Sequence, residues 1–223
     1  MNLTYDNGSV SSSTSSQVTS SSGQTQKISD TTNGSNVTSE TRNVSDFDEV
    51  ELRGIGDLSI RQTGSESLSV EAEDDVLPKI RTEVVNDRLI ISPDPNTSIQ
   101  TTEPINYVLT VKDLHALKLS GSGGIDAEAI DTDKLGVNIS GSGAVDVSGR
   151  ADSQEISVSG SGAYRAEDLQ SKEAKIDVEG AGSAIVNASE TLDAKVSGSG
   201  LVEYIGDPTV KKEVSGSGRV SKH

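Results

Sequence analysis

The chain of 223 residues contains no cysteine and no tryptophan, and only 2% of its residues are aromatic. Without cysteine it cannot form a disulfide scaffold or a cysteine-ligated metal site. A surface that stacks sugars or bases on aromatic rings is also disfavoured, because one phenylalanine and four tyrosines are spread along the whole chain. The core must therefore be built from aliphatic side chains.

Basic residues are scarce as well. Lysine and arginine number 19 against 35 aspartates and glutamates, which gives a formal net charge of −16. This charge repels nucleic-acid phosphates at long range and argues against a polyanionic substrate. No run of apolar residues has the length needed to span a bilayer. We therefore expect neither a nucleic-acid partner nor a membrane-spanning segment.

Residues 1–42 are rich in serine and threonine, and their few apolar residues follow no period. Such a segment cannot bury enough surface to offset its conformational entropy, so we expect a disordered tether. No basic stretch followed by an apolar one marks a signal peptide in it. Because a long Ser/Thr tether suits a surface-anchored protein, we expect an export signal that was removed or that lies upstream.

From Val44 onward, apolar residues alternate with polar ones, as they do around Val50 and Leu52. A period of two indicates β-strands, and no stretch shows a convincing helical period. The prolines between residues 92 and 104 indicate a loop between strands. The sequence thus predicts an all-β domain over residues 43–223.

A Ser-Gly-Ser-Gly motif recurs in the second half of this domain. Successive copies lie 18 to 20 residues apart, and they occupy residues 120–123, 140–143, 159–162, 197–200 and 215–218, with the degenerate copy Glu-Gly-Ala-Gly at 179–182. Similarity at a fixed period of about 20 residues is the signature of a solenoid. We expect irregular N-terminal coils over residues 43–112 and regular ones over residues 113–223.

The columns around the motif support this interpretation. Positions two and four residues before its first glycine, and four and six after it, are apolar in nearly every copy. About 20 residues at ~3.3 Å each suit a coil of three short strands, and stacked coils pair in parallel. Parallel crossovers are right-handed in the great majority of cases, so the pattern predicts a single-stranded right-handed parallel β-helix.

The same apolar offsets surround Gly54-Ile55-Gly56, which indicates one more coil in the irregular part. Gly54 and Gly121 are 67 residues apart. That interval suits about three coils and the proline-containing loop, so we expect these two glycines to lie several coils apart.

The sequence resembles the head GIN domain family of bacterial envelope proteins, also called auto-transporter adhesins. The resemblance rests on residues 42–50, 53–56, 87–91 and 109–111 and on the Ser-Gly series from Leu119, and it covers roughly residues 42 to 220. It implies an exported or lipid-anchored β-helical protein in the bacterial cell envelope. The family defines no catalytic residues, so none are carried over.

Two groups of residues are candidates for an interaction surface. The first is an outward ladder of hydroxyls at the motif, Ser122, Ser142, Ser161, Ser199 and Ser217. Such a ladder could bind a surface glycan or protein, although a short polar side chain is also well tolerated at a tight corner beside glycine. The second is a group of cations near the last motif, Lys211, Lys212, Arg219 and Lys222.

The cations have two interpretations. They form either a charged cap that prevents strand addition or a dock for an acidic surface, and the dock would give head-to-tail self-association. We favour the cap, and salt-sensitive association would support the dock.

An enzyme is the remaining alternative, because many β-helices cleave polysaccharides. Asp126, Asp146 and Arg165 fall in one outward column and could form an acid/base site, but a solvated column of alternating charge is the more economical interpretation. Calcium is disfavoured by a period much longer than that of calcium-binding β-rolls. With His115 and His223 as the two histidines, no zinc site is predicted. We expect no catalytic residue, metal or cofactor.

The sequence therefore predicts a non-enzymatic, exported or cell-surface β-helical module of adhesion type, anchored, if at all, through the tether. The alternatives are an envelope scaffold that associates end to end and a polysaccharide-active enzyme.

Overall fold

The computed structural model describes residues 36–223, and the greater part of the expected tether, residues 1–35, lies outside this range. Residues 36–223 form fifteen strands in one sheet and a short 3₁₀ helix, η1 (Leu77–Lys79). The strands are β1 (Val37–Arg42), β2 (Glu49–Gly54), β3 (Asp57–Gln62), β4 (Ser67–Glu73), β5 (Ile80–Val85), β6 (Arg88–Pro93), β7 (Asn106–Val111), β8 (Ala116–Gly121), β9 (Gly124–Gly141), β10 (Ala144–Gly160), β11 (Ala163–Gly180), β12 (Ser183–Gly198), β13 (Leu201–Ile205), β14 (Thr209–Gly216) and β15 (Arg219–Lys222). The all-β prediction is confirmed.

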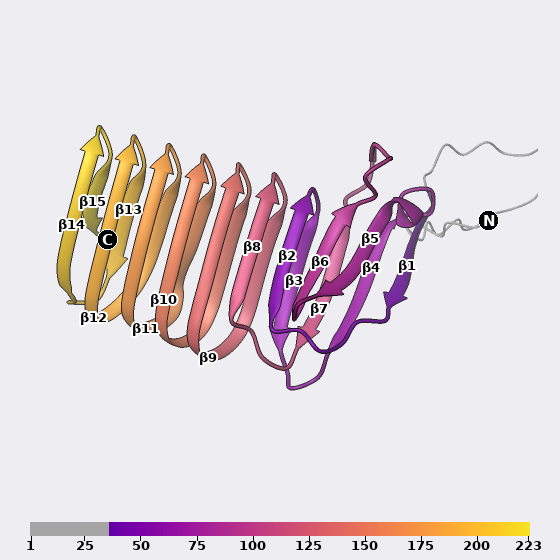
Figure 1. Ribbon diagram of the computed structural model, residues 1–223, viewed down its shortest axis with the longest axis horizontal. Helices are drawn as coiled ribbons and strands as arrows, with labels where there is room; N and C mark the ends of the chain where they lie inside the picture. The colour runs from indigo at the N-terminus through magenta and orange to yellow at the C-terminus, as the bar shows by residue number, and fades with distance from the viewer. Residues whose placement is uncertain (1–35) are drawn as a thin grey trace, which may run out of the picture. The chain divides into compact units, whose positions relative to one another are not determined.

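Strands β9 to β12 each make most of one coil of a parallel β-solenoid with about 20 residues per turn (Figure 1). Each is a single long strand of 16 to 18 residues that bends, so the expectation of three short strands is wrong. In β9 the alternation of buried and exposed residues breaks at Glu128–Ala129 and again at Asp133–Lys134. Backbone pairing resumes after each bend because neighbouring coils bend at equivalent places.

Equivalent residues of successive coils lie opposite one another, as Ile139, Val158, Val178 and Val196 do. The inward columns predicted from the sequence are buried from Leu117 through β12 and form one continuous aliphatic core. Burial of aliphatic area on this scale supplies the main favourable term for folding. The parallel β-helix is therefore confirmed, whereas its right-handed sense stays a prediction from the crossover rule.

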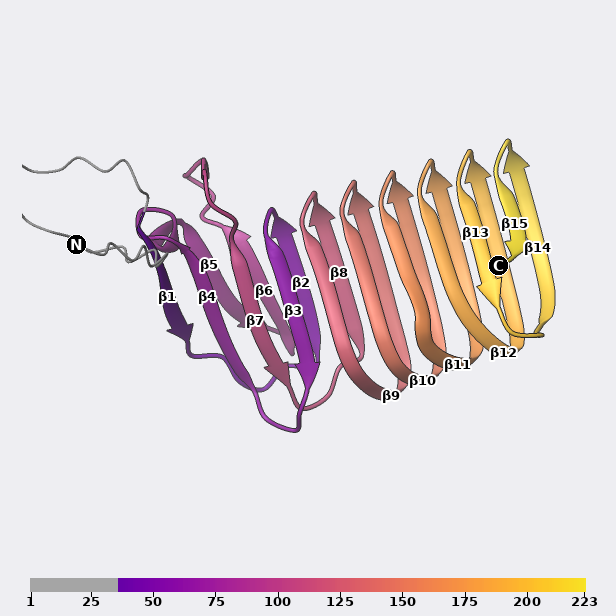
Figure 2. The same cartoon turned by 180° about the vertical axis from the view of Figure 1, so that it is seen from behind.

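Each coil has two long sides, which we name by their relation to the Ser-Gly corner. The entry face contains the segments that run into the corner: β2, β6, β8, the second halves of β9 to β12, and β14. The exit face contains the segments that leave it: β3, β7, the first halves of β9 to β12, β13 and β15. Figure 2 shows the two faces joined by the corner at one end of each coil and by the bend at the other.

The two glycines of each motif serve different purposes. The first has a positive φ, for example +130° at Gly121, where a Cβ would also lie 2.3 Å from the carbonyl oxygen of Gly54. The second points inward, and at Gly143 a Cβ would lie 2.6 Å from Cδ2 of Leu119. Only glycine meets the first requirement without strain and the second without a steric clash.

The irregular part departs from the expected coil order. β2 pairs with β8 and β3 with β9, so Gly54 lies directly opposite Gly121 and not several coils away. The other edge of this coil pairs with β6 and β7, which come later in the sequence (Figures 1 and 2). The coil of β2 and β3 is therefore inserted between two coils that follow it in the chain.

Beyond β6 and β7 the solenoid is covered by strands of opposite direction. β4 pairs antiparallel with β7 and β1 with β4, while β5 pairs antiparallel with β6. β1 occupies Val37–Arg42, so the expectation that the tether extends to residue 42 is wrong at its end. Residues 37–42 form a strand because their backbone groups pair with those of β4, from Val37 opposite Glu73 to Arg42 opposite Leu68. The composition of this segment does not reveal that partner. Within residues 36–223, no helix is long and apolar enough to cross a membrane.

Candidate functional site

The predicted serine ladder lies on the Ser-Gly corner, between the two faces. The side chains of Ser122, Ser142, Ser161, Ser199 and Ser217 are exposed, and Ala181 interrupts the row. Their backbone N–H groups donate to glycine carbonyl oxygens of the preceding coil at 2.8–3.0 Å. The structure thus explains why the corner is regular, while a role of the hydroxyls in binding stays a prediction.

The four C-terminal cations divide between two strands. Lys211 and Lys212 lie on β14 of the entry face, and Arg219 and Lys222 lie on β15 of the exit face. Two of them pair within the chain, since Lys211 Nζ is 3.0 Å from Asp193 Oδ2 and Lys222 Nζ is 2.5 Å from Asp207 Oδ1. Lys212 lies opposite Ala194 but is exposed, because β14 pairs with β12 alone within the described range. The four cations are thus divided between the two faces, and two of them are paired with carboxylates.

The acidic column proposed for an enzyme lies on the exit face. Arg165 Nη1 donates to both carboxylate oxygens of Asp146 at 2.9 Å, and both side chains are nearly half exposed. Burial and, after it, the neighbouring carboxylates of Glu128 and Asp146 raise the pKa of Asp126. These groups border an open hollow of about 210 Å³. The arrangement matches a solvated charge column better than a catalytic cleft.

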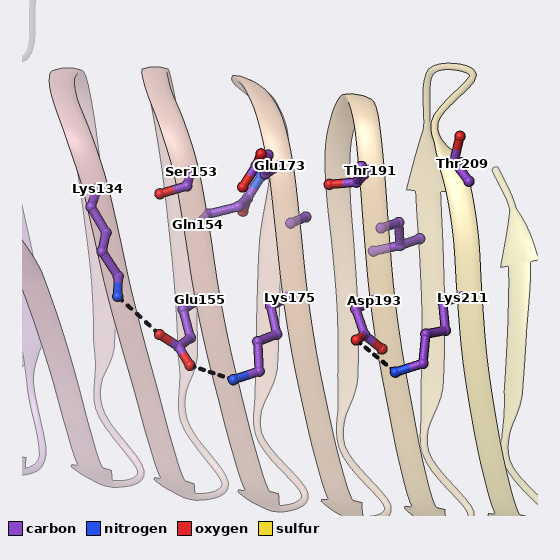
Figure 3. Close-up of a pocket in the computed structure, with 12 residues that line it drawn as sticks. Lys134, Ser153, Gln154, Glu155, Glu173, Lys175, Thr191, Asp193, Thr209 and Lys211 are labelled. Atoms are coloured by element: carbon purple, nitrogen blue, oxygen red, sulfur yellow. Dashed lines mark hydrogen bonds and ion pairs between the residues drawn. The ribbon is translucent and has the colours of Figure 1, made fainter.

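A larger depression runs across the entry face. It consists of two adjoining hollows of about 490 and 270 Å³ that share Glu155. Together they cross β8, β9, β10, β11, β12 and β14, which are successive neighbours in the sheet. We call this depression the entry-face groove; Figure 3 shows its larger part.

Two rows of polar side chains border the groove (Figure 3). One row contains Ser153, Glu173, Thr191 and Thr209, which lie opposite one another on consecutive strands. The second row lies two residues further along each strand and contains Glu155, Lys175, Asp193 and Lys211. Each of the strands β10, β11, β12 and β14 thus places one side chain in each row.

Charges in the second row alternate in sign from coil to coil. Glu155 accepts from Lys175 at 2.8 Å and lies 3.1 Å from Lys134, while Lys211 lies 3.0 Å from Asp193. Hydrogen bonds, first from Lys175 and then from Lys134, lower the pKa of Glu155, and Glu155 in turn raises the pKa of Lys175. Because stacked coils bring equivalent residues together, alternation avoids the like-charge contacts that Asp126 and Asp146 make on the exit face.

Sequence reasoning missed this row. Its signal is the position five residues before the first glycine of each motif, which contains Ala116, Gly136, Glu155, Lys175, Asp193 and Lys211. The small residues at the start of this list form part of the lining of the smaller hollow. Of the charged columns beside the motif, only the position five residues after its first glycine, with Asp126 and Asp146, was weighed as a candidate site, and Lys211 was considered only as one of the C-terminal cations.

The described residues contain no group of three or more histidine, aspartate or glutamate side chains placed to hold a metal ion. His115 Nδ1 lies 3.1 Å from Asp48 Oδ2, and His223 Nδ1 lies 3.8 Å from Glu203 Oε2. Each histidine thus pairs with a single carboxylate.

Solved structures share this fold. A “putative adhesin” from Bacteroides fragilis aligns with a TM-score of 0.68 and 22% identity, over 85% of this chain and 97% of its own. A “putative lipid binding protein” from Parabacteroides distasonis aligns with a TM-score of 0.59 and 26% identity, over 84% and 97%. A “putative adhesin” from the same organism aligns with a TM-score of 0.51 and 24% identity, over 84% and 97%.

No relative was found among proteins with curated descriptions. Residues 46–208, more than half of the chain, match the family described as “Putative auto-transporter adhesin, head GIN domain”. This range begins just before β2 and ends just before β14, so it contains most of the solenoid and, of the antiparallel cover, β4 and β5 but not β1. The chain therefore belongs to the head GIN domain family.

Proposed function

We propose that the protein is a non-enzymatic adhesion module, exported to the bacterial cell envelope and anchored through its N-terminal segment. Family membership and structural neighbours named as adhesins support an adhesion-type role. The strongest support for this role is the repeating pattern of polar side chains on the outer surface. Within residues 36–223, its polar groups repeat from coil to coil along the solenoid and line open hollows. A repeating surface suits many weak contacts with an extended partner.

Adhesion can be tested with beads that carry the full chain, coupled through a tag placed before Met1. We expect these beads to be retained on surfaces coated with cell-wall or mucin glycans. Beads that carry residues 1–35 alone are the matched control, because they contain none of the described solenoid. Equal retention of the two kinds of bead on every surface would contradict the proposal.

The enzyme alternative has its own test. If the acidic column were catalytic, polysaccharide cleavage would disappear in Asp146→Asn and Arg165→Ala variants. We expect no cleavage by the wild-type chain. Cleavage that depends on these two side chains would replace the adhesion proposal.

The end-to-end scaffold is not adopted, because two of its four cations pair with carboxylates of the same chain. Sedimentation at low and high salt tests this choice, and a salt-sensitive increase in mass would restore the scaffold.

A further inference from the structure

The lining of the entry-face groove is nearly neutral. Its lining contains four lysines, Lys118, Lys134, Lys175 and Lys211, and three acids, Glu155, Glu173 and Asp193. The whole chain, in contrast, has a net charge of −16. An anionic polymer is repelled by the molecule as a whole, and a polycation finds no excess of acid in the groove. The groove therefore favours an uncharged ligand that can both donate and accept hydrogen bonds.

The spacing of the polar groups selects among uncharged polymers. Neighbouring strands lie ~4.8 Å apart, so six strands span about 24 Å along the groove. An extended polypeptide rises only ~3.3 Å per residue and turns successive side chains to opposite sides, so it does not match this repeat. Each ring of an extended glycan adds a length close to one strand spacing, and its hydroxyls project to both sides of the chain.

We propose that the entry-face groove binds an extended, uncharged glycan strand that lies across the β-strands, with about one sugar ring per coil. This inference rests on the proposed function and specifies its ligand class. Hydroxyls on one side of the glycan meet the row of Ser153, Glu173, Thr191 and Thr209. Those on the other side donate to Glu155 and Asp193 and accept from Lys175 and Lys211.

The lining also determines how affinity depends on ligand length. No aromatic side chain lines either hollow, so binding depends on hydrogen bonds and not on ring stacking. Each such hydrogen bond makes a small net contribution to the free energy of binding, because it replaces hydrogen bonds to water. Affinity should therefore be weak for a disaccharide and should rise with each added ring until six rings fill the groove.

The test uses the full chain and neutral linear oligosaccharides of two, four and six rings, built from glucose, mannose or N-acetylglucosamine. A hexamer of uronic acid is the charged comparator, and binding is measured by calorimetry or by chemical-shift titration. We expect at least one neutral series to bind with an affinity that rises at least tenfold from two rings to six. Absence of binding by every neutral hexamer, or tighter binding of the uronic acid hexamer, would overturn the proposal.

The site is tested with a double variant, Lys175→Ala with Asp193→Ala, which preserves the net charge. We expect it to weaken hexamer binding at least tenfold. The matched control is Asp146→Ala with Arg165→Ala, which removes an ion pair from the exit face and should change binding less than twofold. Urea unfolding verifies that both variants are folded. Equal affinities of the two variants would place the ligand elsewhere.

The bead assay separates this inference from the proposed function. If beads with the groove variant adhere as well as wild-type beads, the adhesion proposal stands and the groove assignment fails. If wild-type beads do not adhere to any surface, the proposed function fails, whatever the oligosaccharide titration shows.

Discussion

The two parts of the solenoid stack their coils by different rules. From β8 to β12, the strand that follows in the sequence is also the neighbour in space. Between β2 and β7, the first coil is enclosed by two later ones, and antiparallel strands cover the end. A repeated sequence thus specifies how one coil stacks on another. It does not specify how the stack begins, because the first coil requires partners that break the repeat.

The largest expected effect tests whether alternation of buried and exposed residues determines stability in both the regular and the irregular part of the solenoid. Val158 in β10 is fully buried, so Val158→Asp places an unpaired carboxylate between stacked coils. We expect a loss of about 4 kcal/mol or more in the free energy of unfolding, measured with urea. The matched control is Val108→Asp in β7, where the valine is 55% exposed and the loss should stay below about 0.5 kcal/mol. Similar losses at the two sites would contradict the assignment of Val158 as inward-facing and Val108 as outward-facing.

The second prediction concerns the junction of the two parts. Gly121→Ala forces an alanine to φ +130° and brings its Cβ against the carbonyl of Gly54. Strain and overpacking together should cost about 3 kcal/mol. Gly64, in the turn after β3, also has a positive φ, but no atom lies within 4 Å of the position that a Cβ would take there. Gly64→Ala should therefore cost only about 1 kcal/mol, and a cost equal to that of Gly121→Ala would mean that coil stacking adds nothing at the corner.

The third prediction uses one tyrosine from each part. Burial raises the pKa of Tyr107 to about 12 and also raises that of Tyr164 in β11. Above pH 10 the unfolded chain loses these protons while the folded chain keeps them, so stability is intact below pH 10 and falls as the pH rises. Each tyrosine should remove about 1.4 kcal/mol per pH unit between pH 10 and 12.

Unfolding by urea at several alkaline pH values measures this slope. Tyr107→Phe and Tyr164→Phe should each flatten it by about half of the tyrosine contribution. A slope that neither variant changes would show that other groups, such as lysines, cause the alkaline loss.

The smallest expected effect concerns a polar contact inside the regular part. Tyr164 donates to Gln154 Oε1 at 3.0 Å, and Gln154 Nε2 donates to Ser171 Oγ at 2.8 Å. Tyr164→Phe leaves the buried amide oxygen without its donor and should cost about 1–2 kcal/mol. Combining it with Gln154→Met removes both partners, and the double variant should be more stable than the sum of the single effects implies. Additive losses would show that the hydrogen bond between Tyr164 and Gln154 contributes little to the free energy of unfolding.

The regular part was largely predictable, for a physical reason. The apolar columns around Val158 and Val178 repeat at a nearly constant period. The buried and exposed positions, the parallel pairing and the glycine corner of one coil therefore predict those of the next. The position of Gly54 beside Gly121 was not predictable in the same way. It depends on the reversal of direction at β4 and β5, which no repeat encodes.

The candidate site was predictable only in part. The exposed position of the serines at the corner follows from the motif, whereas their role in binding stays a prediction. The alternating row of Glu155, Lys175 and Asp193 is visible in the sequence only when the column five residues before the motif is aligned. The contact of Tyr164 with Gln154 joins two different columns of the core, so it requires knowledge of how the chain bends within a coil.

The insertion of the β2–β3 coil also has a consequence for synthesis of the chain. This coil leaves the ribosome first among the coils, yet its two neighbours, β6–β7 and β8–β9, follow later. One edge therefore waits unpaired until β6 and β7 have emerged, and the other until residues as far as Glu128 have emerged. After that point each new coil needs about 20 residues, or about 1–4 s of translation, and it meets a finished template. In the order of synthesis, the first coils thus complete their pairing together, and the later coils are added one at a time.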